Sequence, residues 1–228
     1  MIHPHSLGSS RIDIAEPNIY LFFSFAKLKA LTTPLQRQTD VVFLLDASTG
    51  VSSDLLKRQK EFVKSLATHF NLSPIGPRGA ALLYANNSNI ISGFRDPNFN
   101  ARIHRALLVN TSRRMDQALL MAAQYLMRNG RSGRKIVILL TAGRQAPGGQ
   151  ELDEAVKPLS KLGAQFFVVA IGQEADSQEL LTAVERVEDI FQVTLSDRLP
   201  SSTRSIAEKI QSKPRKLANF PYHGFRRH

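Results

Sequence analysis

Short apolar runs divide the middle of the chain into regular segments. Uninterrupted or nearly uninterrupted runs occupy residues 41–45, 136–140 and 165–171. Their length and their content of β-branched residues are typical of strands buried on both faces of a parallel sheet. Two further runs, 80–85 and 89–94, are joined by Asn-Asn-Ser-Asn, a sequence that favours a hairpin. The pattern therefore predicts one antiparallel strand at the edge of a mostly parallel sheet.

Helical spacing of apolar residues fills the gaps between these strands. Amphipathic stripes are found at 55–70, 115–126, 152–162, 176–187 and 199–210, with a short helical turn at 102–108 and a last strand at 189–195. Ser52 or Ser53 is a suitable N-cap for the first helix, and Asp176 with Glu179 completes a capping box for the fourth. This alternation predicts a doubly wound α/β fold, with helices on both faces of the sheet.

The 228 residues accommodate one such domain with extensions. We expect residues 1–37 to be an irregular N-terminal extension, 38–211 the domain, and 212–228 a basic, disordered tail. The tail holds Lys213, Arg215, Lys216, Arg226 and Arg227 and no acidic residue. These five cations are candidate contacts for a polyanion.

Charge and cysteine content narrow the possibilities further. The formal net charge is +11 and the pI is about 10.3, so polyanionic glycans, nucleic acid and anionic lipid are all suitable partners. A basic surface that only aids solubility is the alternative. The absence of Cys excludes disulfides and thiolate metal sites. No apolar run approaches the roughly 18 residues of a membrane span, and the apolar stretch 19–26 makes a poor signal peptide.

Enzymatic motifs are absent from the sequence. It contains no phosphate-binding G-x-x-x-x-G-K-[ST], no G-x-G-x-x-G after a strand and no G-x-S-x-G elbow. None of the six His stands beside a Ser or an acid in a catalytic pattern. We therefore expect neither catalysis nor a cofactor. Asp46 and Ser48, which follow the first strand, are the polar residues best placed for a site, since ligands bind beyond the strand ends of such sheets.

Four segments carry a family resemblance. Residues 40–48 (DVVFLLDAS), 116–119 (DQAL), 135–143 (KIVILLTAG) and 163–172 (GAQFFVVAIG) occur in the order and at the separations of a von Willebrand factor type A domain. The resemblance covers about residues 38–211. The Ala-Ile-Gly end of the last segment is most similar to the N-terminal A domains of the long collagen VI chains.

The resemblance implies a metal-ion-dependent adhesion site built by three loops. The family pattern is Asp-x-Ser-x-Ser in the first loop, a Thr before the helical Ala-Leu in the second, and an Asp in the third. Asp46 and Ser48 match this pattern, whereas Gly50, Arg113 and Ala142 replace the other three ligands. A guanidinium in the site opposes cation binding. We therefore expect a degenerate site without metal, although Thr111 or Ser112 could supply an oxygen if the second loop shifts.

We expect Arg113, or alternatively Arg144, to pair with Asp46 where the ion would have been. In the opposing interpretation, Asp46 only caps local backbone amides and Arg113 points to water. Asp54 and Asp116 are expected to be surface residues of their helices or residues that interact with the helix dipole.

The family implies a non-enzymatic adhesion domain, secreted to the extracellular matrix, with matrix proteins such as collagens as partners. Sequons at Asn71, Asn86 and Asn110 fall in predicted loops and would accommodate glycans. One alternative is a polyanion-binding module, with glycosaminoglycan favoured over nucleic acid. Another is an intracellular A-domain scaffold, because the N-terminus shows no clear signal peptide and a cytoplasmic location stays open.

Overall fold

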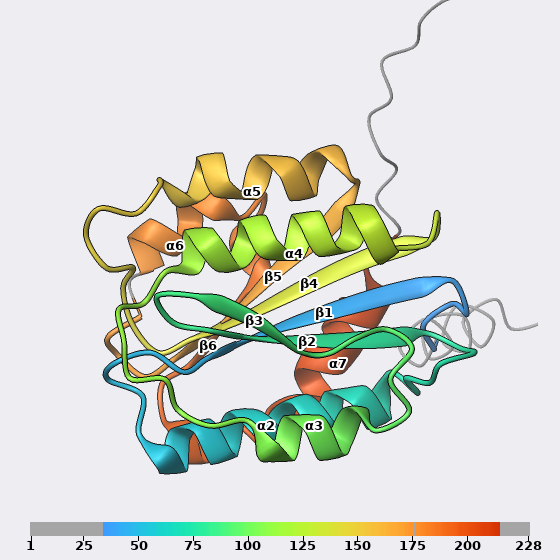
Figure 1. Cartoon of the computed structure of the whole chain (residues 1–228), viewed down its shortest axis with the longest axis horizontal. Coiled ribbons are helices and arrows are strands. Elements are labelled where there is room, and N and C mark those ends of the chain that lie inside the picture. Colours follow the sequence, from blue (N-terminus) through green and yellow to red (C-terminus); the bar gives the residue numbers. More distant parts are fainter. Residues whose placement is uncertain (1–33, 176, 215–228) are drawn as a thin grey trace, which may run out of the picture.

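The computed structural model describes residues 34–175 and 177–214 as an α/β fold around one six-stranded sheet (Figure 1). The strand order is β3-β2-β1-β4-β5-β6, and every neighbouring pair is parallel except β2 and β3. The strands are β1 (Thr39–Asp46), β2 (Arg78–Tyr84), β3 (Ser88–Ser92), β4 (Arg134–Thr141), β5 (Ala164–Ile171) and β6 (Ile190–Val193). The predicted sheet with one antiparallel edge strand is confirmed.

Helices cover both faces of this sheet (Figure 1). One face carries α2 (Ser53–His69), α3 (Phe99–Arg105) and α7 (Thr203–Ser212). The other carries α4 (Met115–Asn129), α5 (Leu152–Lys161) and α6 (Ser177–Ala183). The predicted N-cap of α2 is present, because the Ser52 hydroxyl accepts the Leu55 N–H at 3.0 Å.

The central strand β1 contributes to both hydrophobic layers. All of its residues are buried, which explains why it is a continuous apolar run in the sequence. Val41, Phe43 and Leu45 pack in the layer that contains α2, α3 and α7. Val42 and Leu44 pack in the layer that contains α4, α5 and α6. β1 is thus held from both sides, and its C-terminal end has a defined position.

Three predicted element boundaries are wrong in the C-terminal third. The helix predicted at 176–187 ends at Ala183, and Val187 is 68% exposed in a 3₁₀ turn. The last helix begins at Thr203 instead of 199, and residues 199–202 form a turn before it. The last strand is shorter than predicted, and Asp176 lies outside the described residues.

The first described residues, 34–37, contact the domain. Leu35 is buried in the α2 layer, and the Arg37 Nε donates to the Ile75 carbonyl at 2.9 Å. Residues 1–33 of the predicted extension, and tail residues Arg215, Lys216, Arg226 and Arg227, lie outside the described residues. Within the described part of the chain, every helix is too short or too polar to cross a bilayer.

Candidate functional site

Three loops meet at the C-terminal edge of the parallel strands. They are residues 47–52 after β1, 106–114 between α3 and α4, and 142–151 after β4. The first two are tied by the Thr49 N–H, which donates to the Thr111 carbonyl at 2.8 Å. The second and third are tied by the Ala146 N–H, which donates to the Arg113 carbonyl at 2.8 Å. The strand order reverses between β1 and β4, so the loops surround the position where sites form in such sheets.

Asp46 lies at the centre of these loops and is fully buried. Its Oδ1 accepts the N–H of Ser48 at 3.0 Å and the Ser48 hydroxyl at 2.6 Å. Its Oδ2 accepts the Arg113 Nε at 2.7 Å and the Ala142 N–H at 3.1 Å. Both carboxylate oxygens are therefore saturated with donors, as a buried charge requires.

Arg113 connects all three loops through one guanidinium. Besides Asp46, it donates from Nη1 to the Arg144 carbonyl at 3.2 Å and from Nη2 toward the Thr49 carbonyl at 3.4 Å. Its side chain is 11% exposed, and that of Asp46 is 0% exposed. The predicted pair between Arg113 and Asp46 is present, and the alternative in which Arg113 points to water is wrong. Arg144 contributes its backbone oxygen to this arrangement.

Two glycines shape the space around the guanidinium. Gly50 has a φ of +91°, a conformation that a serine with its Cβ would adopt only under strain. At Gly143, a Cβ would lie 2.4 Å from Arg113 Nη1. The loops after β1 and β4 are therefore fitted to the arginine, and the position of the second family serine has a backbone suited to glycine.

Two residues that sequence reasoning missed, Gln59 and Tyr84, lie next to Asp46. Gln59 of α2 is fully buried; its Oε1 accepts the Asp46 N–H at 2.9 Å and its Nε2 donates to the Asp46 carbonyl at 3.0 Å. The Tyr84 hydroxyl donates to the Leu140 carbonyl at 2.8 Å. Burial and the charge of Asp46 raise the pKa of Tyr84 well above its ordinary value, so its hydroxyl stays protonated. A polar Gln within the apolar stripe of α2 was the available sequence signal.

A second buried carboxylate stands beside this site, at Asp116. The expectation of a surface position is wrong for Asp116, which is fully buried, and right for Asp54, which is exposed and pairs with Arg58. Arg114 binds Asp116 through two hydrogen bonds of 2.9 and 2.7 Å. Burial alone would raise the pKa of Asp116, but Arg114 and the N–H of Gln150 hold it below its ordinary value. The loop after β4 is thereby fixed to the start of α4.

The remaining predicted residues are distributed over the surface. The Thr111 hydroxyl accepts the Asn86 N–H at 3.1 Å, and Ser112 is exposed. The sequon residues Asn71, Asn86 and Asn110 are all exposed, in loops or turns. Lys213 pairs with Asp189 and lies over the Phe167 ring, with its side chain 18% exposed, so its charge is already balanced.

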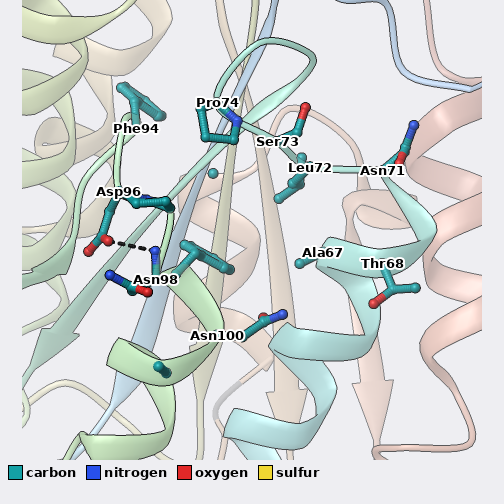
Figure 2. Close-up of a pocket in the computed structure, with 14 residues that line it drawn as sticks. Ala67, Thr68, Asn71, Leu72, Ser73, Pro74, Phe94, Asp96, Asn98 and Asn100 are labelled. Carbon is teal, nitrogen blue, oxygen red and sulfur yellow. Dashed lines mark hydrogen bonds between the residues drawn. The ribbon is translucent and has the colours of Figure 1, made fainter.

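A hollow of about 400 Å³ opens at the opposite edge of the sheet, between the end of α2 and the start of α3 (Figure 2). Polar side chains at its rim include Asn71, Asp96, Asn98 and Asn100. The Asp96 carboxylate accepts the Asn98 N–H at 2.8 Å, which holds the loop before α3. None of the three loops around Asp46 contributes to this hollow, so it is separate from the candidate site.

The fold and the three loops together define the family. Residues 40–205 match the von Willebrand factor type A domain, and the chain belongs to that family. This match spans the sheet and the loops that hold Asp46, Arg113 and Ala142.

Individual relatives match at lower identity. The chain is 28% identical to Cuticlin-6 of Caenorhabditis elegans over 142 residues, which make up 60% of this chain and 24% of that protein. Structures of proximal thread matrix protein 1 from the mussel byssus align with a TM-score of 0.70 at 21% identity, covering 79% of this chain and 48% of theirs. One structure of that mussel protein, whose aligned sequence is 20% identical to this chain, has zinc in its metal-ion-dependent adhesion site (MIDAS) motif. The chain thus spans about a quarter of the length of Cuticlin-6 and about half of the length of the mussel protein.

Proposed function

We propose that this chain is a non-enzymatic protein-interaction domain whose adhesion site works without a divalent cation. The observation that carries the proposal is the 2.7 Å ion pair between the Arg113 Nε and Asp46 Oδ2. The guanidinium supplies the positive charge that a metal ion would supply in the family's adhesion site. It also joins the three loops that such an ion would join.

The ligands around Asp46 do not suit a divalent cation. Mg²⁺ requires about six oxygens near octahedral geometry. Here both Asp46 oxygens accept two hydrogen bonds each, and the Ser48 hydroxyl donates to one of them. An ion bound to Asp46 would meet the Arg113 guanidinium at close range, and Ala142 offers only its backbone N–H to Asp46. Binding a cation would require expelling the Arg113 side chain, which is only 11% exposed.

The proposed setting is the extracellular matrix. Support comes from the names of two relatives, a cuticlin and a thread matrix protein, and from the resemblance to collagen VI A domains. Secretion, collagens as partners and glycans at Asn71, Asn86 and Asn110 belong to this proposal. An intracellular scaffold is the competing assignment, and the distribution of the full chain between medium and cytosol of secreting cells distinguishes the two.

Thermal unfolding in the presence of metal ions tests the site directly. We expect the Tm of the full chain to be the same in EDTA and in millimolar Mg²⁺, Mn²⁺ or Zn²⁺. An ion that binds only the folded state raises stability by about 2.7 kcal/mol at 100 times its dissociation constant. A saturable rise in Tm that EDTA reverses would show that the site holds a metal and that the proposal is wrong.

A further inference from the structure

Helix α2 carries a row of cations along one side. Lys57, Lys60 and Lys64 are spaced i, i+3 and i+7, so their side chains project from the same side of the helix. Seven residues at 1.5 Å each separate the first from the last by about 10 Å. Glu61 is the acidic residue within this row, and Asp54 is already paired with Arg58 at 2.7 Å.

This row faces α3. The Lys60 Nζ donates to the His104 carbonyl at 3.1 Å and to the Ala106 carbonyl at the end of α3. At their other ends, Thr68 of α2 and Asn100 of α3 line the same hollow (Figure 2). The two helices therefore run side by side in opposite directions below the sheet (Figure 1).

Arg105 adds a further cation to the same surface. It is exposed in the last turn of α3, next to the carbonyls that bind Lys60. We call Lys57, Lys60, Lys64 and Arg105 the α2–α3 basic surface. Elsewhere many cations are paired with carboxylates: Arg78 and Arg131 share Asp40, Arg113 pairs with Asp46, Arg114 with Asp116, and Arg204 with Glu208.

On the α2–α3 basic surface, Glu61 offsets one of these charges but forms no ion pair in the described residues. Among the residues that the structure describes, Lys57, Lys64 and Arg105 form no ion pair. Lys60 is satisfied by backbone carbonyls, and burial lowers the pKa of its amine. Part of the net charge of +11 is thus concentrated on one face of two adjacent helices.

We propose that the α2–α3 basic surface is a binding site for a linear sulfated polysaccharide. The cations lie along a helix axis and match the repeated charges of an extended polyanion. Single-stranded nucleic acid would in addition need aromatic platforms for its bases. The large apolar side chains exposed in the described residues include no Phe, Tyr or Trp. This site is distinct from the loops around Asp46, and the proposal does not depend on whether those loops bind a divalent cation.

Salt dependence of heparin binding provides the quantitative test. Three contacts from Lys57, Lys64 and Arg105 predict a slope of log Kd against log salt of about 2.7, by the counterion-release relation for nucleic acids. The affinity of the full chain for a heparin dodecasaccharide should then fall about 40-fold between 50 and 200 mM salt. The double variant Lys57→Gln/Lys64→Gln should lower this slope by about 2.

Arg128→Gln/Lys161→Gln is the matched control, because it removes two exposed cations from the opposite face of the sheet. Its slope should equal that of the unchanged chain, and circular dichroism checks that both variants fold. Equal slopes in both double variants would overturn the proposal. So would loss of binding on removal of residues 215–228 alone, or tighter binding to single-stranded DNA or phosphatidylserine vesicles than to heparin under the same conditions.

Discussion

Replacing Arg113 by Met tests whether the guanidinium holds the three loops together. The substitution keeps an unbranched apolar stem and removes the partner of a carboxylate that is 0% exposed. Removing one member of a buried ion pair costs about 3–5 kcal/mol when the other is left without compensation. Asp46 would keep three neutral donors, the N–H and hydroxyl of Ser48 and the N–H of Ala142. The expected loss is therefore smaller, about 2–3 kcal/mol.

Urea unfolding followed by far-UV circular dichroism measures this loss, since the chain has no Trp. For a domain of this size, each kcal/mol lowers the Tm by about 2–4 °C, so the Tm should fall by about 5–10 °C. Arg128→Met is the matched control: Arg128 is exposed on α4, and its substitution should change stability by less than about 0.5 kcal/mol.

A double-mutant cycle separates the pair from general packing effects. Asp46→Asn and Arg113→Met should be coupled by at least about 1 kcal/mol, because each removes the same contact. Additive losses, or a loss below about 1 kcal/mol for Arg113→Met alone, would refute the reasoning. Additive losses would mean that the ion pair does not contribute to stability. A loss below about 1 kcal/mol for Arg113→Met would mean that the three remaining donors satisfy Asp46.

Three further predictions concern the same loops and the opposite end of β1. The double variant Arg113→Thr/Ala142→Asp restores two family ligands, and we expect Mn²⁺ to raise its Tm but not that of the unchanged chain; an equal rise in both would contradict this. Gly143→Ala places a Cβ 2.4 Å from Arg113 Nη1 and should cost about 1–3 kcal/mol by urea unfolding, with most of that cost absent in an Arg113→Met background. Burial alone would raise the pKa of Asp40, but hydrogen bonds and charge from Arg78 and Arg131 lower it. The stabilisation from Asp40 is therefore present above about pH 4 and lost as the pH falls further, which urea midpoints between pH 7 and 3 should show; a midpoint that does not fall in acid would argue against it.

Parts of the candidate site were accessible from sequence because they lie in short motifs. Asp46 and Ser48 follow a buried strand directly, and the family pattern placed Arg113 at a ligand position. The pairing of Arg113 with Asp46 could then be inferred from charge alone. The structure added the two carbonyl contacts of Arg113 and the saturation of Asp46 by four donors.

Other parts could not be predicted because their partners are distant in sequence. Gln59 binds the backbone of Asp46 from a helix; its place in the apolar stripe of α2 indicates burial but does not identify its partner. The helix dipole favours an acid such as Asp116 in the first turn of a helix, but this preference does not predict whether the acid is buried. Its burial depends on Arg114 and on the N–H of Gln150, which the loop after β4 brings to α4.

The sequence by itself determined the layered α/β fold and the family, and it placed Gly50, Arg113 and Ala142 at three ligand positions of the family pattern. Apolar periodicity reports which faces are buried, and the short motifs at strand ends report which side chains share the edge of the sheet. Only the tertiary structure decided how Asp46 is satisfied, which acids are buried and which cations lack a partner. Those properties depend on distances between side chains from different elements, and such distances are set only when the helices pack on the sheet. The α2–α3 basic surface is of this kind, because Arg105 joins the α2 lysines only when α3 lies beside α2.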